Sequence, residues 1–456
     1  MGSSIYSNLS PTAHKLKLQL DDDQLTNCMR CGFCLPACPT YAQTGIEAES
    51  PRGRIALMKA VADGIMKPDQ VFEQQMNHCL GCRACEPACP ADVKYGQLLE
   101  QARDAIEDHT QSHRWWIRMV RFLAFKVFFP QQRRMRILGM LLSVYQQSGL
   151  QYLIRKSGMM QLLPAHMRDM EKILPQASMR GVIQHIGEYH PAVGKKIATV
   201  ALFRGCIMDV CFTQTNIHTV KLLQIAGFEV WIPREQSCCG ALHAHSGEAE
   251  GARALARHNV RVFQEAGVDY VVSNAGGCGA ILVEYDHLLH KETAWKEQAK
   301  SFAKKVIDIS ELLVRHGRSL PFQEAHQRGD AQIRITIQDS CHLRNVMKSS
   351  QAPRELIRQI PDVQLIEMKE ADRCCGSAGI YNLTQPDMAN QILDHKMTHT
   401  LATQAHTVIT CNPGCLLQMK LGVKRNEDHG QESPHMKVEH IVDFMYDYLH
   451  RKPSSE

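Results

Sequence analysis

The stretches SCCGALH, residues 237–243, and ADRCCGSAG, residues 371–379, each place two cysteines side by side. Adjacent cysteines are poorly placed for a mutual disulfide, because the bridge requires Cα atoms about 5.5 Å apart and a defined torsion angle. The sulfur atoms of both pairs therefore need another partner.

Composition points to reduced thiols. The chain has 456 residues, 18 of them cysteine, 44% hydrophobic residues and a net charge of +5. It shows no signal peptide with an apolar core and no run of roughly 20 uncharged apolar residues, so we expect a cytoplasmic protein. In that compartment many cysteines indicate metal binding or redox chemistry rather than disulfides. The modest net charge does not suggest nucleic-acid binding.

Ten of the cysteines form an internal repeat. They fall into two sets of five, which are Cys206, Cys211, Cys238, Cys239 and Cys278, and Cys341, Cys374, Cys375, Cys411 and Cys415. Corresponding members keep a nearly constant offset, which is 135 positions from Cys206 to Cys341 and 137 positions from Cys278 to Cys415. Such an offset indicates a duplicated structural unit.

The repeat extends to the predicted elements. Residues 196–206 and 332–341 are β-rich runs that end in cysteine, 227–233 and 362–368 are strands ahead of the paired cysteines, and 250–267 and 386–404 have helical spacing. Residues 269–280 and 407–417 are strands that break into glycine-containing turns. This order predicts two α/β units. Because ligands gather at the carboxyl edge of such sheets, cysteines 30 to 40 positions apart can converge there.

The other eight cysteines form two dense runs. NCMRCGFCLPACP, residues 27–39, and HCLGCRACEPACP, residues 78–90, both match the CxxCxxCxxxCP run of two-cluster ferredoxins. This resemblance implies two [4Fe-4S] clusters in a mostly helical module. It implies the ligand sets Cys28, Cys31, Cys34 and Cys89 for one cluster, and Cys79, Cys82, Cys85 and Cys38 for the other. Zinc is the alternative metal, since CxxC pairs also build tetrahedral zinc sites.

The paired cysteines, with a leading cysteine and a trailing GC, resemble the cysteine-rich CCG domain of heterodisulfide reductase subunits and of several respiratory dehydrogenases. Behind a two-cluster ferredoxin module, the arrangement resembles the glycolate oxidase (glycolate dehydrogenase) iron–sulfur subunit family. Residues 49–59, ESPRGRIALMK, and 374–384, CCGSAGIYNLT, are the more specific stretches. The iron–sulfur subunit of anaerobic glycerol-3-phosphate dehydrogenase has the same broad layout.

The resemblance implies an electron-transfer subunit of an oxidoreductase complex, with no catalytic residue for hydroxy-acid oxidation in this chain. A flavoprotein partner would carry FAD, oxidise a 2-hydroxy acid, glycolate to glyoxylate, and pass electrons on toward a quinone or another acceptor. The chain agrees, because it has no GxGxxG that opens a helix after a strand and no Walker loop. The alternative is a thiol–disulfide enzyme of the heterodisulfide reductase type.

The resemblance also implies a noncubane [4Fe-4S] cluster in one or both CCG repeats. The expected ligands are Cys206, Cys238, Cys239 and Cys278 in the first repeat, and Cys341, Cys374, Cys375, Cys411 and Cys415 in the second. The first repeat has Asn274 at the position of Cys411, with Cys211 as a substitute, so we expect the second repeat to be the fuller site. Bound zinc or a reduced, empty cysteine set is the alternative in either repeat.

Two further expectations concern residues beside the cysteines. Gly240 and Gly376 directly follow the pairs, where glycine can take φ > 0 or admit backbone close to a bulky cluster. Arg52 and Arg54 follow the first ferredoxin run, and we expect them in a solvated loop, with pairing to a partner carboxylate or to the negative charge of a cluster as the alternative.

The segment between the modules is basic. Residues 113–136 contain seven Lys or Arg and no acidic residue, and on a helix Arg114 and Arg118 lie opposite Trp115 and Met119. Such a helix can lie on an anionic membrane, on the cytoplasmic face, or pack its apolar side on the CCG repeats or a partner. We expect four domains, namely a ferredoxin-type module at 1–112, a basic amphipathic helical connector at 113–195, and CCG repeats at 196–320 and 321–456.

Overall fold

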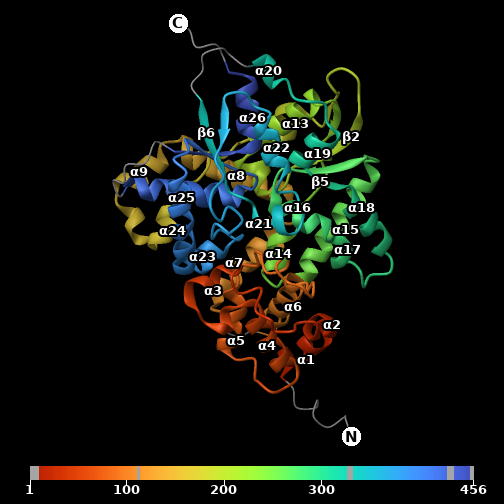
Figure 1. The fold of residues 1–456 in the computed structure, drawn as a ribbon, viewed down its shortest axis with the longest axis vertical. Helices are drawn as coiled ribbons and strands as arrows, with labels where there is room; N and C mark the ends of the chain where they lie inside the picture. The colour runs from red at the N-terminus through yellow and green to blue at the C-terminus, as the bar shows by residue number, and fades with distance from the viewer. Residues whose placement is uncertain (1–9, 110–112, 326–331, 429–435, 452–456) are drawn as a thin grey trace.

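The computed structural model describes residues 10–109, 113–325, 332–428 and 436–451. A helical N-terminal module lies at one end of the molecule, and two α/β layers form the other end (Figure 1). The predicted fold class, a helical ferredoxin module followed by two α/β repeats, is confirmed. The expected domain border at residue 112 falls outside the described residues.

The N-terminal module consists of short helices around one apolar core. They are α1 (Pro11–Gln19), α2 (Asp22–Thr26), α3 (Pro39–Thr44), the 3₁₀ turn η2 (Glu47–Glu49), α4 (Pro51–Ala62), α5 (Gln70–Asn77) and α6 (Tyr95–Glu107). Helix α4 begins where Ser50 accepts a hydrogen bond from the Gly53 amide and Pro51 occupies the first turn. Leu16, Met58 and Leu98 are fully buried in this core. The two cysteine runs are the loops that precede α3 and α6.

The first sheet has the strand order β1-β3-β2-β4-β5. Its strands are β1 (Tyr189–His190), β2 (Ala198–Phe203), β3 (Phe228–Trp231), β4 (Tyr270–Ser273) and β5 (Val306–Asp308). All neighbours are parallel except β1, which runs antiparallel to β3. Its helices are α12 (Ile207–Cys211), α13 (Thr213–Ile225), α14 (Ala241–His245), α15 (Ala249–Glu265), α16 (Gly276–Val283), α17 (Tyr285–Leu288), α18 (Lys296–Lys305), α19 (Ile309–His316) and α20 (Phe322–Ala325).

The second sheet repeats this topology. Its order β7-β6-β8-β9 matches β3-β2-β4-β5, and every neighbouring pair is parallel. The strands are β6 (Ile333–Ile337), β7 (Val363–Leu365), β8 (Thr407–Thr410) and β9 (Lys437–His440). The helices are α21 (Cys341–Asn345), α22 (Ala352–Arg358), α23 (Tyr381–Thr384), α24 (Pro386–Ala402), α25 (Pro413–Asp428) and α26 (Ile441–Leu449). All residues of β8 are buried, as expected for a parallel strand covered on both faces.

The two repeats share one core across an approximate two-fold axis. Helix α13 of the first repeat packs on α26 of the second. In the equivalent contact, α22 of the second repeat packs on α19 of the first. The hydroxyl of Thr215 donates to the Asp443 carboxylate at 2.7 Å, and the hydroxyl of Ser349 donates to Glu311 in the equivalent contact. Val200 and Phe228 of the first repeat lie in the same apolar cluster as Ile441 of the second. The repeats therefore form one folded body.

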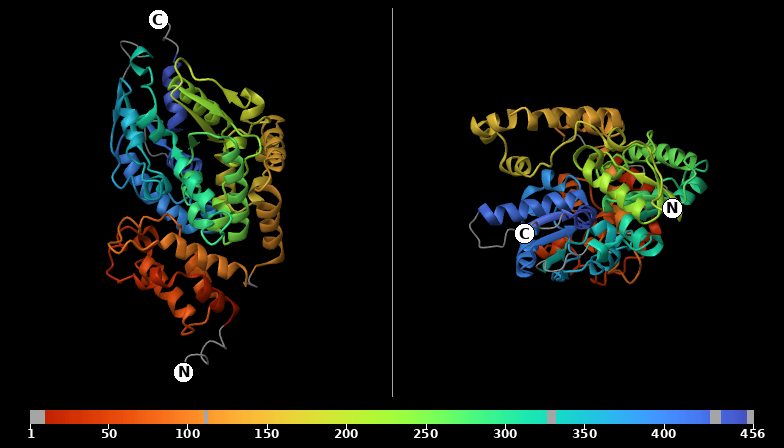
Figure 2. Two further views of the ribbon diagram at one scale, coloured as in Figure 1. Left: turned by 90° about the vertical axis from the view of Figure 1, so that its right-hand side faces the viewer. Right: turned by 90° about the horizontal axis from the view of Figure 1, so that it is seen from above.

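The connector lies as a separate layer along the outer side of the α/β body (Figure 2). It comprises α7 (Trp115–Arg121), the π-helical turn η3 (Phe122–Phe128), α8 (Gln132–Gln147), α9 (Leu150–Lys156), the 3₁₀ turn η4 (Met159–Leu162), α10 (Ala165–Lys172) and α11 (Val182–Ile186). Among the described residues, no helix combines the length and the apolar character needed to cross a bilayer.

Candidate iron–sulfur centres

The first expected ferredoxin set lies at the surface of the N-terminal module. Cys31 is exposed, and Cys28, Cys34 and Cys89 are half-buried against the module core. Burial raises the pKa of the Cys34 thiol, and the nearby sulfur of Cys28 raises it further. These side chains come from the run before α3 and from the last cysteine of the second run, which are distant in sequence. This set faces solvent on one side.

The second expected set lies deeper. Cys38, Cys79, Cys82 and Cys85 are all buried and line one small cavity. Burial raises the pKa of Cys82 and Cys85 well above the ordinary thiol value. Thiolates in this site would therefore need a compensating cation, which a bound metal would supply.

Fixed donors surround the second set. The amide of Gly81 and the hydroxyl of Tyr95 each donate a hydrogen bond to Cys79 Sγ at 3.4 Å. Thr40 Oγ1 lies 3.3 Å from Cys38 Sγ and donates to the Glu49 carbonyl oxygen at 2.8 Å. Of these groups, the Gly81 amide and the Tyr95 hydroxyl are donors to sulfur, and such donors stabilise thiolate ligands and raise the reduction potential of a bound cluster.

Arg54 lies behind the second set, and the expectation of a solvated loop was wrong for this residue. Its side chain is fully buried in helix α4, and it donates to the carbonyl oxygens of Gln75 and Glu49 and to Thr40 Oγ1. Burial alone would lower its pKa, but the negative charges of Cys79 and its neighbours raise the pKa above the ordinary value. The sequence signal that was missed is the Ser-Pro helix start at Ser50, which turns the arginine inward.

The first CCG site is built at the carboxyl ends of three strands. Cys206 follows β2 at the start of α12, Cys238 and Cys239 follow β3, and Cys278 follows β4 in α16. Cys206 Sγ and Cys238 Sγ are 3.5 Å apart, and Cys239 lies beside both Cys238 and Cys278. The site lies where the strand order reverses between β2 and β4, the usual binding position of an open α/β sheet.

The second CCG site repeats this arrangement. Cys341 begins α21 after β6, Cys374 and Cys375 follow β7, and Cys415 lies in α25 after β8. Cys374 lies beside Cys341 and Cys375, and Cys375 lies beside Cys415. Four neighbouring cysteines therefore form a chain in the same order in each repeat, and all of them are buried except Cys278, which is half-buried.

Cys411 is not part of this chain. It is buried in the apolar cluster between the two sheets together with Ile409 and Ile441. Its carbonyl oxygen accepts a hydrogen bond from the Gly276 amide of the first repeat at 3.1 Å. The equivalent Asn274 is also turned into the core, where it donates to Asn216 and Thr219. Cys411 and Asn274 therefore occupy equivalent buried positions in the core of the two repeats.

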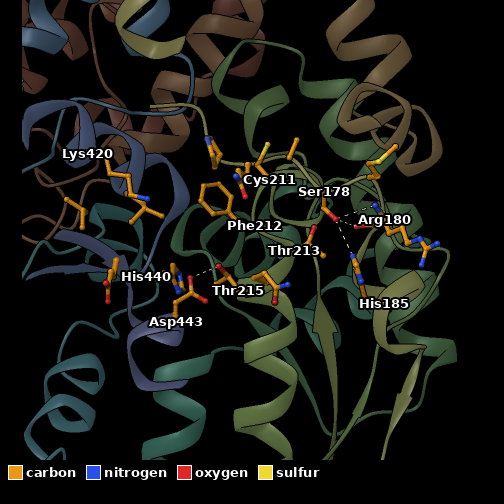
Figure 3. A pocket seen from close by; sticks show the side chains of 18 of the residues that line it. Ser178, Arg180, His185, Cys211, Phe212, Thr213, Thr215, Lys420, His440 and Asp443 are labelled. Carbon is orange, nitrogen blue, oxygen red and sulfur yellow. Dashed lines mark hydrogen bonds between the residues drawn. The ribbon is translucent and has the colours of Figure 1, made fainter. Parts of the chain in front are cut away.

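Cys211, the remaining cysteine, lies beside a cleft of about 750 Å³ (Figure 3). The cleft lies between the end of the connector, helices α12 and α13, and the second repeat, and Arg180, His185, Lys420 and Asp443 give it a polar lining. Burial and the nearby Cys206 raise the pKa of Cys211 to about 11. Cys211 therefore lies close to the first site without joining the four linked sulfur atoms.

The two expected glycines have left-handed backbones. Gly240 has φ +86° and Gly376 has φ +92°, which side chains with a Cβ rarely adopt. A Cβ on Gly376 would also lie 2.6 Å from the carbonyl oxygen of Ala389, whereas the nearest atom at Gly240 is 3.4 Å away. Glycine is required to turn the chain directly after each cysteine pair.

The two sites differ in one buried side chain on the helix behind the cysteine pair. In α15, Asn259 donates to the Cys238 carbonyl oxygen and accepts from the Ser237 amide, both at 2.9 Å. In α24, 137 positions later, Lys396 is 1% exposed and donates to the carbonyl oxygen of Glu370. Burial lowers the pKa of Lys396, and the sulfur atoms of Cys375 and Cys374 oppose that shift. The second site therefore has a buried cation where the first has a neutral amide.

The second CCG site contacts the buried ferredoxin set. Cys82 lies in one apolar cluster with Cys341 and Cys374. Tyr381 of α23 donates to the carbonyl oxygen of His78 at 3.0 Å. The first repeat meets the module through Arg103, which donates to the carbonyl oxygens of Cys79 at 2.6 Å and His245 at 3.0 Å. Only the second of the two sites shares an apolar cluster with a ferredoxin cysteine in the described part of the chain.

All four sets offer sulfur donors only, which suits iron–sulfur clusters. The family models agree with this chemistry. The 4Fe-4S dicluster domain matches residues 24–93, the cysteine-rich CCG domain matches 200–283 and 335–420, and the linker region of the glycolate oxidase iron–sulfur subunit matches 116–174.

Whole-chain comparisons point the same way. The chain is 48% identical over 442 residues to the probable glycolate oxidase iron–sulfur subunit of Bacillus subtilis (strain 168), covering 97% of this chain and 98% of that protein. It is 29% identical to the glycolate oxidase iron–sulfur subunit of Escherichia coli (strain K12), covering 86% and 89%. Lactate utilization protein A of Halalkalibacterium halodurans is 33% identical over 50% of this chain and 90% of its own length. The chain therefore belongs to the family of glycolate oxidase iron–sulfur subunits.

Proposed function

We propose that this chain carries electrons from a flavoprotein partner, which oxidises glycolate to glyoxylate on FAD, toward a quinone or another acceptor. The similarity to two glycolate oxidase iron–sulfur subunits supports the substrate, and the lack of a dinucleotide-binding fingerprint in the chain supports a flavin on the partner. Hydroxy-acid oxidation would then need no catalytic residue of this chain.

One structural observation supports the route, which is the contact of Cys82 with Cys341 and Cys374. Clusters held by the ferredoxin cysteines accept and release single electrons. We infer that the exposed set with Cys31 faces the donor, and that electrons cross to the CCG repeats where Cys82 meets the second site. Met29 and Phe33 beside Cys31 are exposed apolar side chains that suit a transient partner contact.

The ligand sets are part of the same proposal. Each ferredoxin cluster would use the four cysteines given above, and each CCG repeat would hold a noncubane [4Fe-4S] cluster on four cysteines. For the first repeat these are Cys206, Cys238, Cys239 and Cys278, and for the second Cys341, Cys374, Cys375 and Cys415. The left-handed glycine after each pair supports close approach of the backbone to a bulky group.

We also propose a role for each domain of the chain. Residues 1–112 would form the electron-transfer module, 113–195 the connector, and 196–320 and 321–456 the two CCG repeats. The complex would work in the cytoplasm, and a peripheral contact with the membrane would bring it to a quinone pool.

Anaerobic purification with all associated subunits tests this function. We expect a flavoprotein to copurify, and the electron paramagnetic resonance (EPR) signals of reduced clusters to appear on addition of glycolate. Lactate and glycerol 3-phosphate serve as the competing substrates. If none of the three reduces a cluster, the substrate class is wrong. Disulfide reduction by the chain without its partners would favour the thiol–disulfide alternative instead.

Cys82→Ser tests the assignment within the ferredoxin module. It should remove the EPR signal of the buried cluster and leave the signal of the exposed one. Metal analysis distinguishes iron from zinc in the repeats. An iron content of only about eight atoms per chain, together with stoichiometric zinc, would contradict clusters at both CCG sites.

A further inference from the structure

The connector exposes an unusual amount of apolar surface. We call residues 113–168 the connector arm, which runs from just before α7 to the start of α10. Of the 32 large hydrophobic side chains that are exposed in the described part of the chain, 18 lie in this arm. Soluble proteins rarely leave contiguous apolar patches of this kind uncovered, and such patches mark interaction sites.

Helix α8 shows that the exposure is directional. Met135, Gly139 and Ser143 are buried at a spacing of four residues and face α12, where a Cβ on Gly139 would come within 2.8 Å of the Val210 side chain. The opposite side of α8 carries Ile137, which is 54% exposed, and Leu141, which is 62% exposed. A helix on the surface of a soluble protein normally has polar residues on that side.

The preceding segment repeats the pattern with aromatic residues. Phe125 is buried against His243, whose ring lies 5.0 Å away, and this contact fixes the segment to the first repeat. Trp115, Met119 and Phe122 follow helical spacing and are all exposed. Phe125 therefore packs on the first repeat, whereas Trp115, Met119 and Phe122 face away from it and present an uncovered apolar surface.

The arm is also strongly cationic. Residues 113–168 contain ten Lys or Arg and no Asp or Glu. The acidic partners of Arg121 and Lys126 come from outside the arm, chiefly Glu248 of the first repeat at 3.1 Å from each. Arg114, Arg133 and Lys156 are exposed beside the apolar side chains.

We propose that the connector arm docks on an anionic lipid surface. Its helices would lie in the plane of the headgroups, with Ile137, Leu141 and Phe122 inserted among the upper acyl chains and the arginines against lipid phosphates. Trp115 and Trp116 suit the interface, where an amphipathic ring meets both apolar and polar surroundings. Ten basic residues and no acid over residues 113–168, next to exposed tryptophan and phenylalanine side chains, match an anionic lipid surface, which attracts basic amphipathic helices.

Only the purpose of this lipid contact rests on the proposed function, because the contact would serve to deliver electrons to quinone in the membrane. Binding itself needs no substrate. Failure of lipid binding and failure of glycolate-dependent reduction are therefore separate results, and either can occur without the other.

Vesicle flotation with the full, iron-loaded chain tests the docking. We expect the chain to float with vesicles of phosphatidylcholine containing phosphatidylglycerol, to bind pure phosphatidylcholine at least tenfold more weakly, and to be released as salt screens the charges. The double variant Ile137→Glu/Leu141→Glu should lose at least tenfold in binding to the anionic vesicles.

Ile65→Glu/Val71→Glu provides the matched control, because both residues are exposed apolar side chains of the N-terminal module. It should bind like the wild type. Unchanged iron content and circular dichroism establish that each variant is folded, and Arg114→Gln/Arg133→Gln tests the charge without adding an acid. Wild-type binding by the Ile137→Glu/Leu141→Glu variant, or no binding by any form, would overturn the proposal. Loss of flavoprotein copurification in that variant, with vesicle binding retained, would mean that a protein covers the arm.

Discussion

Asn345 donates a hydrogen bond from Nδ2 to the carbonyl oxygen of Cys82 at 2.9 Å, across a separation of 263 residues. Asn345 ends the helix that begins at Cys341, and it is 4% exposed. One buried bond therefore joins the ligand loop of the ferredoxin module to the helix that carries a cysteine of the second CCG site.

Asn345→Leu should weaken the contact between the ferredoxin module and the second CCG repeat. The carbonyl oxygen of Cys82 would remain buried without its donor, so the free energy of unfolding should fall by about 1–2 kcal/mol. Electron transfer from the module to the second site should slow, as measured by rapid-freeze EPR. Asn382→Leu is the control, because Asn382 donates to Gln418 within the second repeat. Equal slowing in both variants would show that the effect is general loss of stability.

Cys411→Ala and Cys415→Ala separate a core thiol from a proposed ligand. Cys411→Ala should leave the iron content unchanged and cost about 1 kcal/mol of stability through a small cavity. Cys415→Ala should lose the iron of the second repeat. Metal analysis and thermal unfolding measure both effects. Loss of iron from the Cys411→Ala variant would show that Cys411 is a ligand of the second site.

Gly376→Ala and Gly240→Ala should have unequal effects. Both backbones are left-handed, which costs alanine about 1–2 kcal/mol. At Gly376 the added Cβ must also displace the Ala389 carbonyl oxygen, so we expect greater destabilisation there and loss of iron from the second repeat. Denaturant unfolding and iron analysis of the two purified variants check this order. The prediction is wrong if Gly240→Ala is the more damaging substitution.

Lys396→Asn should make the second site resemble the first. Removing a buried cation near an anionic cluster favours its oxidised form, and the reduction potential should fall by on the order of tens of millivolts. An EPR-monitored redox titration measures the shift. Lys424→Asn changes the same charge at a side chain that is 48% exposed and should leave the potential unchanged. A matching shift in the control would indicate an effect of net charge.

Asp443→Asn should give a pH-dependent loss of stability. Burial alone would raise the pKa of Asp443, but hydrogen bonds from His218 and Thr215 and the charge of His440 hold it below the ordinary carboxyl value. A lowered native pKa adds stability above the unfolded pKa of about 3.9, and this is lost as the pH falls through the native value. The variant should therefore be less stable by about 1–2 kcal/mol near pH 7. Urea unfolding from pH 7 to pH 3 should show the difference shrinking in acid.

Much of the fold follows from local pattern. The strands that precede Cys206, Cys238, Cys341 and Cys374 lie within the predicted runs as β2, β3, β6 and β7, although β3 and β7 are shorter than the runs that predicted them. The short strands β5 and β9 were not predicted. Three or four residues carry too little periodicity to distinguish a strand from a loop, and these two strands exist because β4 and β8 offer open edges.

The sequence pattern did not predict where some individual side chains lie, because packing decides their positions. Cys411 and Cys415 are four residues apart and look alike in sequence, yet one faces the core and the other joins the sulfur chain. The turn between β8 and α25 decides which of them faces the second site. Arg54 was expected in solvent and is buried, because a charged side chain can be buried when carbonyl oxygens and thiolates surround it.

Metal-ligand spacing and sheet-forming runs are local properties, so the amino-acid sequence alone predicts two ferredoxin-type cysteine runs and a duplicated α/β unit with paired cysteines. The three-dimensional fold was needed to place the second CCG site in one apolar cluster with Cys82, Lys396 beside that site, and the exposed apolar side chains of the connector arm. Those relationships join residues that are distant in the chain, and they arise from which apolar surfaces the fold buries and which it leaves exposed.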